Sequence, residues 1–226
     1  MSTLQKSERE IRIDLAAAFR LFARLGMHEA VANHLSAAVS ADGKQFLINP
    51  KWKHFSTLRA SDLVLLDATA APEDIDPGLI DVTAWAIHGQ IHKLRPQVRV
   101  AMHLHPVHVT AISSLEKAEI LPIDQNTARY YNRVALDRDF SGMADNAAEG
   151  ARLVSILGSK SRLLMGNHGV LITADSIGEA FDDMYTIERA CQILAIAHAT
   201  GQPLRILSPE VAERTARDWE SIRDFS

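Results

Sequence analysis

Two histidines separated by one residue, His103 and His105, end a stretch in which apolar and polar residues alternate from Val98. In a β-strand, residues i and i+2 share one face, so the two rings are rooted roughly 6–7 Å apart and can reach one ion. A zinc-type site that works on a substrate needs a third protein ligand and an open position. His168, in the turn Gly166–Gly169, is the candidate third ligand. The alternative is that so short a motif is two ordinary histidines.

Other reactive side chains give weaker patterns. His88 and His92 form an i, i+4 pair that could also bind a metal, but the glutamate of H-E-x-x-H is absent between them. His108 is expected to pack in the protein or to contact a metal ligand rather than the metal itself. Cys191 lies on an apolar helical stripe, which favours a place in the core over a nucleophilic role. The remaining histidines, expected in loops or on helix surfaces and given no role, are His28, His54 and His198.

The composition limits the classes of function. The chain has 226 residues, with 24 Lys and Arg against 28 Asp and Glu, a formal net charge of −4. This balance argues against a nucleic-acid-binding protein that relies on bulk positive charge. No segment approaches the roughly 20 apolar residues of a membrane span, and Met1–Glu10 has no signal-type apolar run. One cysteine cannot form an intrachain disulfide, so we expect a cytoplasmic protein, built as a single domain over residues 1–226.

Caps and turns outline the elements that position these histidines. Ser7 and Glu10 form a capping box before a helix that ends at Gly26. Asp42-Gly43 predicts a hairpin between strands at His34–Ser40 and Lys44–Asn49. Further strands are predicted at Leu63–Leu66, Val98–His105, Ile120–Ile123, Val134–Leu136, Arg162–Met165 and Val170–Thr173. Further helices are predicted from Thr83 to before Pro96, from Pro106 to Leu115, over Ala147–Leu157, from Ser176 to Gly201 and after Ser208. The pattern predicts an α/β sandwich with a mixed or mostly antiparallel sheet.

Several ordered sequence blocks carry a family resemblance from about Glu10 to Leu204. They are NHLSAAVS (Asn33–Ser40), FLINP (Phe46–Pro50), SDLVLLD (Ser61–Asp67), IHGQIHKLRPQV leading into MHLHP (Ile87–Pro106), GNHGVLIT (Gly166–Thr173) and EAFDDMYTIERACQ (Glu179–Gln192). Together they resemble the class II aldolase/adducin family, with forms that lean toward its adducin-like branch.

The resemblance implies a three-layer α/β/α sandwich with a mostly antiparallel central sheet, assembled as a homotetramer with sites at subunit interfaces. It implies a divalent ion held by His103, His105 and His168, with Zn2+ first and Mn2+, Fe2+ or Co2+ as alternatives. The expected chemistry is Lewis-acid stabilisation of an enediolate or enolate from a small-molecule substrate. Aldol cleavage, epimerisation, dehydration and decarboxylation in such a family share this kind of anion.

Departures from the family pattern concern the catalytic acid and the phosphate site. The family's catalytic glutamate corresponds to Ala84, whose methyl group cannot move a proton. Of two phosphate-binding serines, one is replaced by Val82 and the other by Thr83, which can still donate. Lys51 and His34 stand where other phosphate-binding groups occur, and Lys with protonated His could hold a carboxylate. His34, Lys51 and Thr83 are therefore the candidate substrate-binding residues.

The group that replaces the glutamate is open. Tyr130, Tyr131 and Asp124 lie near the region where relatives keep auxiliary catalytic groups, although plain packing also explains the two tyrosines. We expect a metal-dependent lyase that cleaves a C–C bond in a small hydroxy-carbonyl or carboxylated compound. The alternatives are a metal-dependent decarboxylase of a (hydroxy)aromatic or keto acid, and a non-catalytic scaffold like adducin, whose head domain lacks these histidines. Retention of all three histidines favours an enzyme.

Overall fold

A mostly antiparallel sheet forms the centre of the protein in the computed structural model, which describes residues 6–140 and 142–222. Its strand order is β3-β2-β1-β4-β7-β6-β5. Only β5 and β6 pair in parallel, and every other neighbouring pair is antiparallel. The strands are β1 (His34–Ala38), β2 (Gln45–Ile48), β3 (Val64–Asp67), β4 (Val100–Leu104), β5 (Val134–Asp137), β6 (Arg162–Met165) and β7 (Gly169–Ala174). This confirms the predicted sheet type.

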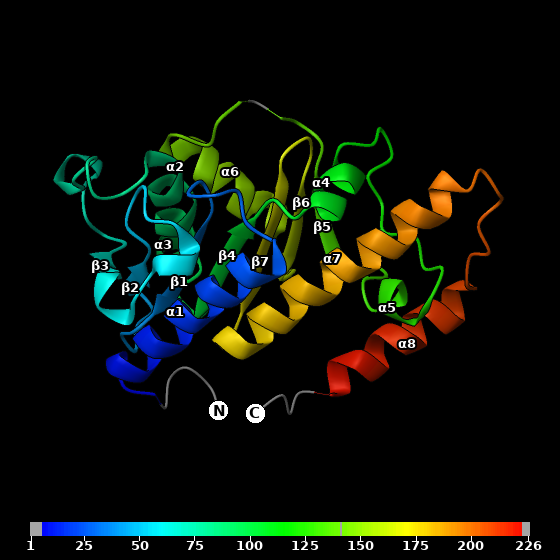
Figure 1. The fold of residues 1–226 in the computed structure, drawn as a ribbon, viewed down its shortest axis with the longest axis horizontal. Helices are drawn as coiled ribbons and strands as arrows, with labels where there is room; N and C mark the ends of the chain where they lie inside the picture. Colours follow the sequence, from blue (N-terminus) through cyan, green and yellow to red (C-terminus); the bar gives the residue numbers. More distant parts are fainter. Residues whose placement is uncertain (1–5, 141, 223–226) are drawn as a thin grey trace.

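Helices cover both faces of this sheet, so the protein has three layers (Figure 1). The helices are α1 (Glu8–Leu25), α2 (Val82–Ala84), α3 (Gln90–Leu94), α4 (Val107–Ser113), α5 (Gln125–Ala128), α6 (Ala147–Leu157), α7 (Ile177–Ala199) and α8 (Pro209–Ser221). On one face α1 and α7 pack over a core that includes Leu35 and Met102. On the other face α3 and α6 pack over a core that includes Ala101 and Leu171.

The local signals explain the helix ends. The Ser7 and Glu10 side chains form the complete capping box at the start of α1, and Gly26 ends that helix in the left-handed conformation. The side chain of Ser176 accepts a hydrogen bond from the Glu179 amide at the start of α7. Both ends of α1 and the start of α7 therefore lie within one residue of the predicted positions.

The β1–β2 hairpin turn requires glycine. Gly43 has a φ of +76°, and a Cβ placed on it would lie 2.0 Å from the carbonyl oxygen of Pro96. This close approach holds the hairpin against the segment that leads into β4, the strand that carries the H-x-H motif.

We expect Gly43→Ala to lower the free energy of unfolding by about 2 kcal/mol or more, because alanine meets both an unfavourable φ and a backbone clash. Gly178→Ala is the matched control, since Gly178 lies in α7 with open space around the added methyl. Alanine there should raise stability by about 0.5–1 kcal/mol. Urea denaturation of both variants tests the expectation, and equal stabilities would contradict it.

Three predicted strand features differ from the structure. Residues Ile120–Ile123 form no strand, because Pro122 has no amide hydrogen and the Ile123 amide bonds to the Thr127 side chain. The run at Leu63–Leu66, expected to be a buried strand, is instead the edge strand β3, where Leu65 is 43% exposed. The alternation also begins later than expected, since Val98 precedes β4 and packs with Ala101 on the opposite face from Met102.

The helix that carries His88 also differs from its prediction. Asp81, not Thr83, caps its start, and the Asp81 side chain accepts the Thr83 amide at 2.9 Å. The π-helical segment Trp85–Gly89 then joins α2 to α3. A π turn takes one more residue than an α turn, and no periodicity in the sequence announces it. The short helix α5 was not predicted either.

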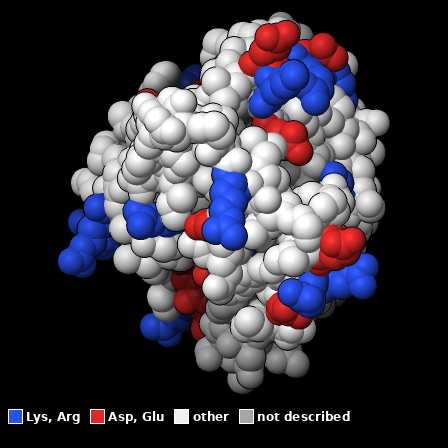
Figure 2. Space-filling view, turned by 90° about the vertical axis from the view of Figure 1, so that its right-hand side faces the viewer, with Lys and Arg blue, Asp and Glu red and all other residues white. Residues whose placement is uncertain are grey.

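The surface carries both charge signs in small groups. On the face shown in Figure 2, Lys and Arg alternate with Asp and Glu among larger uncharged areas. Within residues 6–140 and 142–222, no helix combines the length and apolar character that crossing a bilayer requires.

Candidate metal centre

Three histidine rings meet at the end of β4 and at the β6–β7 turn. His103 lies on β4, His105 follows that strand, and His168 lies in the turn. One nitrogen from each ring can be chosen so that all three lie within 4.8 Å of one another. The Nε2 atoms of His103 and His105 are 2.9 Å apart, and the His168 ring centroid lies 4.8 Å and 4.6 Å from theirs. The expected convergence of these residues is therefore present.

The protonation of the rings suits a cation. The Nδ1 of His103 lies 3.1 Å from the Val170 carbonyl, so it carries the proton and leaves the Nε2 lone pair free. Burial, followed by repulsion from His168, lowers the pKa of His105 to about 4. Burial also lowers the pKa of His168, against the opposing effect of Asp137. Neutral imidazoles with converging lone pairs are the donor set that Zn2+ binds, so these residues fit a divalent metal.

The turn that presents His168 is held from several sides. The His168 amide bonds to the Met165 carbonyl, the Gly166 amide to the Asp137 carbonyl, and the Asn167 amide to the Ser113 carbonyl. A Cβ on Gly169 would lie 2.6 Å from both the His105 ring and the Leu104 carbonyl. Glycine at the end of the N-H-G sequence therefore lets the turn lie directly against His105 and brings the third ring close.

His34 lies beside this triad. It pairs with His103 across β1 and β4, and the two ring centroids are 5.0 Å apart. Burial, followed by repulsion from His88, lowers the pKa of His34 well below its usual range. The ring is therefore neutral, and the protonated His34 assumed from the sequence is corrected. A neutral ring can still donate one hydrogen bond.

The other two candidate binding residues, Thr83 and Lys51, have different partners. Thr83 donates its hydroxyl to the Asp81 carboxylate at 2.6 Å. Burial raises the pKa of Asp81, but the two Thr83 hydrogen bonds, assisted by the charge of Lys51, outweigh it and lower the pKa overall. Lys51 donates to the Pro77 carbonyl at 3.3 Å. Thr83 thus bonds directly to a carboxylate that sequence reasoning missed, and the charge of Lys51 acts on it without a direct contact among the described residues.

Ala84 is buried among apolar side chains. It packs with Phe46, Ile48 and Ile80 in a small core beneath α2. The position to which the family resemblance assigns the catalytic glutamate is thus a closed apolar contact in this chain. The proton donor or acceptor for any reaction has to come from another residue or from water.

The weaker candidates, Tyr130, Tyr131 and Asp124, lie around α5 rather than at the triad. The Tyr130 hydroxyl is buried and donates to Asp183, with both the carbonyl and the carboxylate at 3.2 Å. Asp124 caps α5 by accepting the Thr127 amide, and Tyr131 follows that helix, half-buried. The contacts of Tyr130 and Asp124 hold α5 in place and do not reach the histidine triad.

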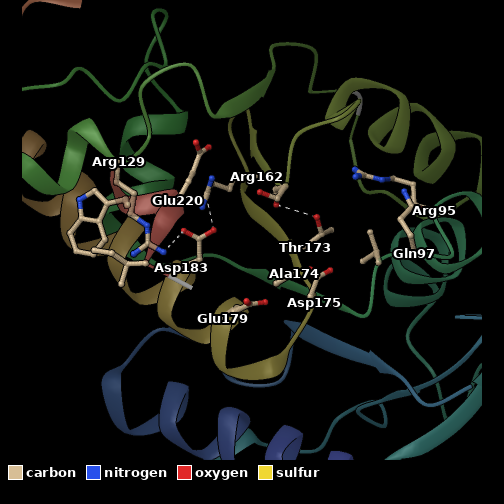
Figure 3. A pocket seen from close by; sticks show the side chains of 14 residues that line it. Arg95, Gln97, Arg129, Arg162, Thr173, Ala174, Asp175, Glu179, Asp183 and Glu220 are labelled. Carbon is tan, nitrogen blue, oxygen red and sulfur yellow. Dashed lines mark hydrogen bonds and ion pairs between the residues drawn. The ribbon is translucent and has the colours of Figure 1, made fainter. Parts of the chain in front are cut away.

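Asp183 also binds arginines at the edge of a cavity of about 310 Å³ (Figure 3). Its carboxylate contacts Arg162 at 2.5 Å and Arg129 at 3.4 Å. Arg162 begins β6, whereas His168 follows the end of that strand. The cavity and Tyr130 therefore lie at the far end of β6 from the histidine triad.

Comparison with known proteins identifies the family. The sequence profile described as "Class II Aldolase and Adducin N-terminal domain" matches residues 13–195. The chain belongs to the class II aldolase/adducin family. Among solved structures, an aldolase II superfamily protein from Pseudomonas syringae superposes with a TM-score of 0.86 at 30% identity, covering 97% of this chain and 88% of that one. An L-fuculose 1-phosphate aldolase from Glaciozyma antarctica PI12 gives a TM-score of 0.80 at 28% identity, covering 93% and 82%.

Curated relatives in this class II aldolase/adducin family have different functions. The decarboxylase NovR of Streptomyces niveus is 28% identical over 91% of this chain and 76% of its own length. Rat beta-adducin is 29% identical over 93% of this chain, but the match spans only 29% of the adducin. Family membership therefore establishes the fold and the superfamily, while the reaction has to be argued from the site.

Sequence reasoning missed Asp81, Ser36 and Phe140 near this site. Asp81 precedes Thr83 by two residues, a spacing typical of an aspartate N-cap, and reading that cap would have found it. Ser36 is two residues beyond His34 in the same strand, so strand alternation places it on the same face. The Phe140 ring lies 6.2 Å from the His168 ring, and no local pattern indicates that contact.

Proposed function

We propose that this protein is a divalent-metal-dependent lyase that breaks a C–C bond in a small hydroxy-carbonyl or carboxylated compound. The observation that carries the proposal is the meeting of three neutral imidazoles, from His103, His105 and His168, at one point. Such a three-ligand set leaves a position for water or substrate, as in catalytic zinc sites. Zn2+ is the first choice, with Mn2+, Fe2+ and Co2+ as alternatives. The ion would supply Lewis-acid stabilisation of negative charge on a substrate oxygen.

The residues around the triad favour a substrate with a carboxylate. Lys51 supplies a positive charge that acts on Asp81, and the charge of Asp81 acts in turn on His34. An ammonium group and an N–H donor together suit a carboxylate. Asp81 is negative and would repel that group, so it is better suited to accept a hydrogen bond from a substrate hydroxyl.

The apolar setting of Ala84 favours decarboxylation over aldol cleavage of a sugar phosphate. Loss of CO2 leaves an anion without prior removal of a proton, so the bond-breaking step needs no base at that position. The decarboxylase relative supports this choice. The scaffold alternative, suggested by the adducins, has less support because a scaffold has no need for three converging histidines.

Product analysis of the zinc-loaded protein tests the proposal. We expect CO2 release from a member of a panel of hydroxy acids, keto acids and hydroxyaromatic carboxylates, and negligible aldehyde release from a ketose 1-phosphate. The control is the His168→Ala protein with the same substrates. Vigorous cleavage of the sugar phosphate would show the argument from Ala84 to be wrong, and turnover without metal would contradict the proposal as a whole.

Two further proposals concern assembly and location. We propose a homotetramer, the assembly that the family resemblance implies, and light scattering measures the mass of the assembly directly. The single cysteine is buried and unpaired, which is compatible with the cytoplasmic location expected from the sequence.

A further inference from the structure

A buried chain of hydrogen bonds leads away from the triad through four side chains. The Nδ1 of His34 lies 2.8 Å from the Nε2 of His88, whose Nδ1 lies 2.6 Å from the Oγ of Ser36. The same Oγ lies 2.8 Å from the Nε2 of His92. All four side chains are buried. The chain starts beside His103 and ends inside the protein at the Nδ1 of His92, which has no hydrogen-bond partner in the described part of the structure.

The rings in this chain are neutral. Burial, together with the neighbouring His92, lowers the pKa of His88 to about 3, and burial, together with Arg99, lowers that of His92 to about 3. A neutral imidazole donates at one nitrogen and accepts at the other. Within residues 6–140 and 142–222, the Ser36 hydroxyl has only the two rings as partners. The hydroxyl makes both hydrogen bonds only if it donates to one ring and accepts from the other. The tautomer of each histidine in the chain therefore determines the tautomer of the next.

The buried end decides the direction of the coupling. The Nδ1 of His92 makes no hydrogen bond within the described residues, while the buried Arg99 lowers the pKa of this ring and the backbone carbonyl of Gly43 raises it. A lone pair on the Nδ1 of His92 is favourable near this cation, and an unpaired buried lone pair is tolerated more readily than an unpaired N–H. His92 therefore carries its proton on Nε2.

That proton sets each tautomer along the chain. The Nε2–H of His92 donates to Ser36, the Ser36 hydroxyl donates to Nδ1 of His88, and the Nε2–H of His88 donates to Nδ1 of His34. The proton of His34 is then on Nε2, and this atom has no partner among the described residues.

We infer that His34 is a neutral hydrogen-bond donor to an anionic oxygen of the substrate, and that Ser36, His88 and His92 are positioning residues that fix its donor tautomer. A preorganised neutral N–H aimed at a developing oxyanion stabilises it without reorganisation. This role rests on the proposed function for its substrate, but the tautomer itself is a property of the protein alone.

Nuclear magnetic resonance of metal-free protein labelled with 15N-histidine measures the tautomers directly. We expect the Nε2–H form at His34, His88 and His92. Variants that each replace one histidine assign the resonances. In Ser36→Ala, His34 should become a mixture of tautomers, whereas Ser36→Thr keeps the hydroxyl and should keep the single form. If Ser36→Ala fails to fold, His92→Phe removes the ring that donates to Ser36 while retaining a ring against Phe46. The Ser36 hydroxyl is then free to donate to His88 or to accept from it, so His34 should again become a mixture of tautomers. A proton on Nδ1 of His34, or an unchanged tautomer in the variant that lacks the hydroxyl, would overturn the inference.

Oxalate binding to the zinc-loaded protein, measured by calorimetry, tests the consequence for a ligand. Ser36→Ala should weaken oxalate binding by about tenfold, the effect of one hydrogen bond, with its zinc content unchanged. Ser36→Thr should bind as the unchanged protein does. Equal affinity in all three proteins would reject the positioning role. If the unchanged protein bound no zinc, the proposed function would be rejected, but the tautomer measurement on the metal-free protein would still test the inference.

Discussion

His168→Ala is expected to lower zinc affinity more than about 100-fold, since residues that merely support metal ligands already change affinity by about 10–100-fold. The variant leaves two imidazoles, His103 and His105, whose Nε2 atoms are 2.9 Å apart and can share one proton instead of an ion. We expect His103→Ala to have a similar effect. Elemental analysis after gel filtration, with competition against a chelator, gives the occupancy and the affinity.

His198→Ala is the matched control for this measurement, because His198 is an exposed histidine near the end of α7. It should retain the full metal content. Circular dichroism should show the same fold in all these proteins, because the triad lies at a turn and a strand end. Full zinc occupancy in His168→Ala would contradict the assignment of the metal centre and, with it, the proposed lyase function.

Lowering the pH from 7 to 5 is expected to destabilise the metal-free protein by about 4 kcal/mol through two histidines alone. His88 and His92 have pKa values lowered from 6.5 to about 3 in the folded protein, chiefly by burial. Below pH 6.5 the unfolded chain binds protons at these rings and the folded protein does not. The stability they contribute is therefore complete above pH 6.5 and is lost as the pH falls toward 3. At pH 5 each ring accounts for about 2 kcal/mol.

Urea denaturation at the two pH values, with a chelator present, measures this loss. His92→Phe should lose about 2 kcal/mol less than the unchanged protein between pH 7 and pH 5, because one buried ring no longer titrates. His198→Gln should behave as the unchanged protein, since its site is exposed. Equal stability of the unchanged protein at both pH values would mean that these rings are accessible to protons in the folded state.

Elements with strong local signals could be predicted from the sequence. The helix over Ala147–Leu157 and the strand Arg162–Met165 have the predicted bounds, because Gly158 ends the first and a tight turn follows the second. The convergence of His103 and His105 also follows from local geometry, since alternate residues in a strand share a face. His168 was a candidate because it lies in a glycine-flanked turn, and the family resemblance implied the same ligand, but local patterns alone do not pair that turn with β4.

Features that depend on packing could not be predicted. The i, i+4 spacing of His88 and His92 is compatible with a metal pair, and only the position of β1 shows that Ser36 joins them instead. The apolar run at Ile120–Ile123 has strand composition, yet no strand in the described part of the chain pairs with it. Asp81 was overlooked because Thr83 is also a good capping residue, and the choice between them depends on where the chain turns.

The wide turn at Trp85–Gly89 makes the layout of the site depend on chain length as well as on side-chain identity. Asp81 lies before this turn and His92 after it. The one additional residue of the π turn therefore determines how far Asp81 is rotated about the helix axis relative to His92. Each residue advances an α-helix by about 100°. A homologue that lacked one residue here would swing its helix start, with the carboxylate, round the axis relative to the buried rings. Such a chain could keep every side chain named above and still have a differently shaped substrate pocket.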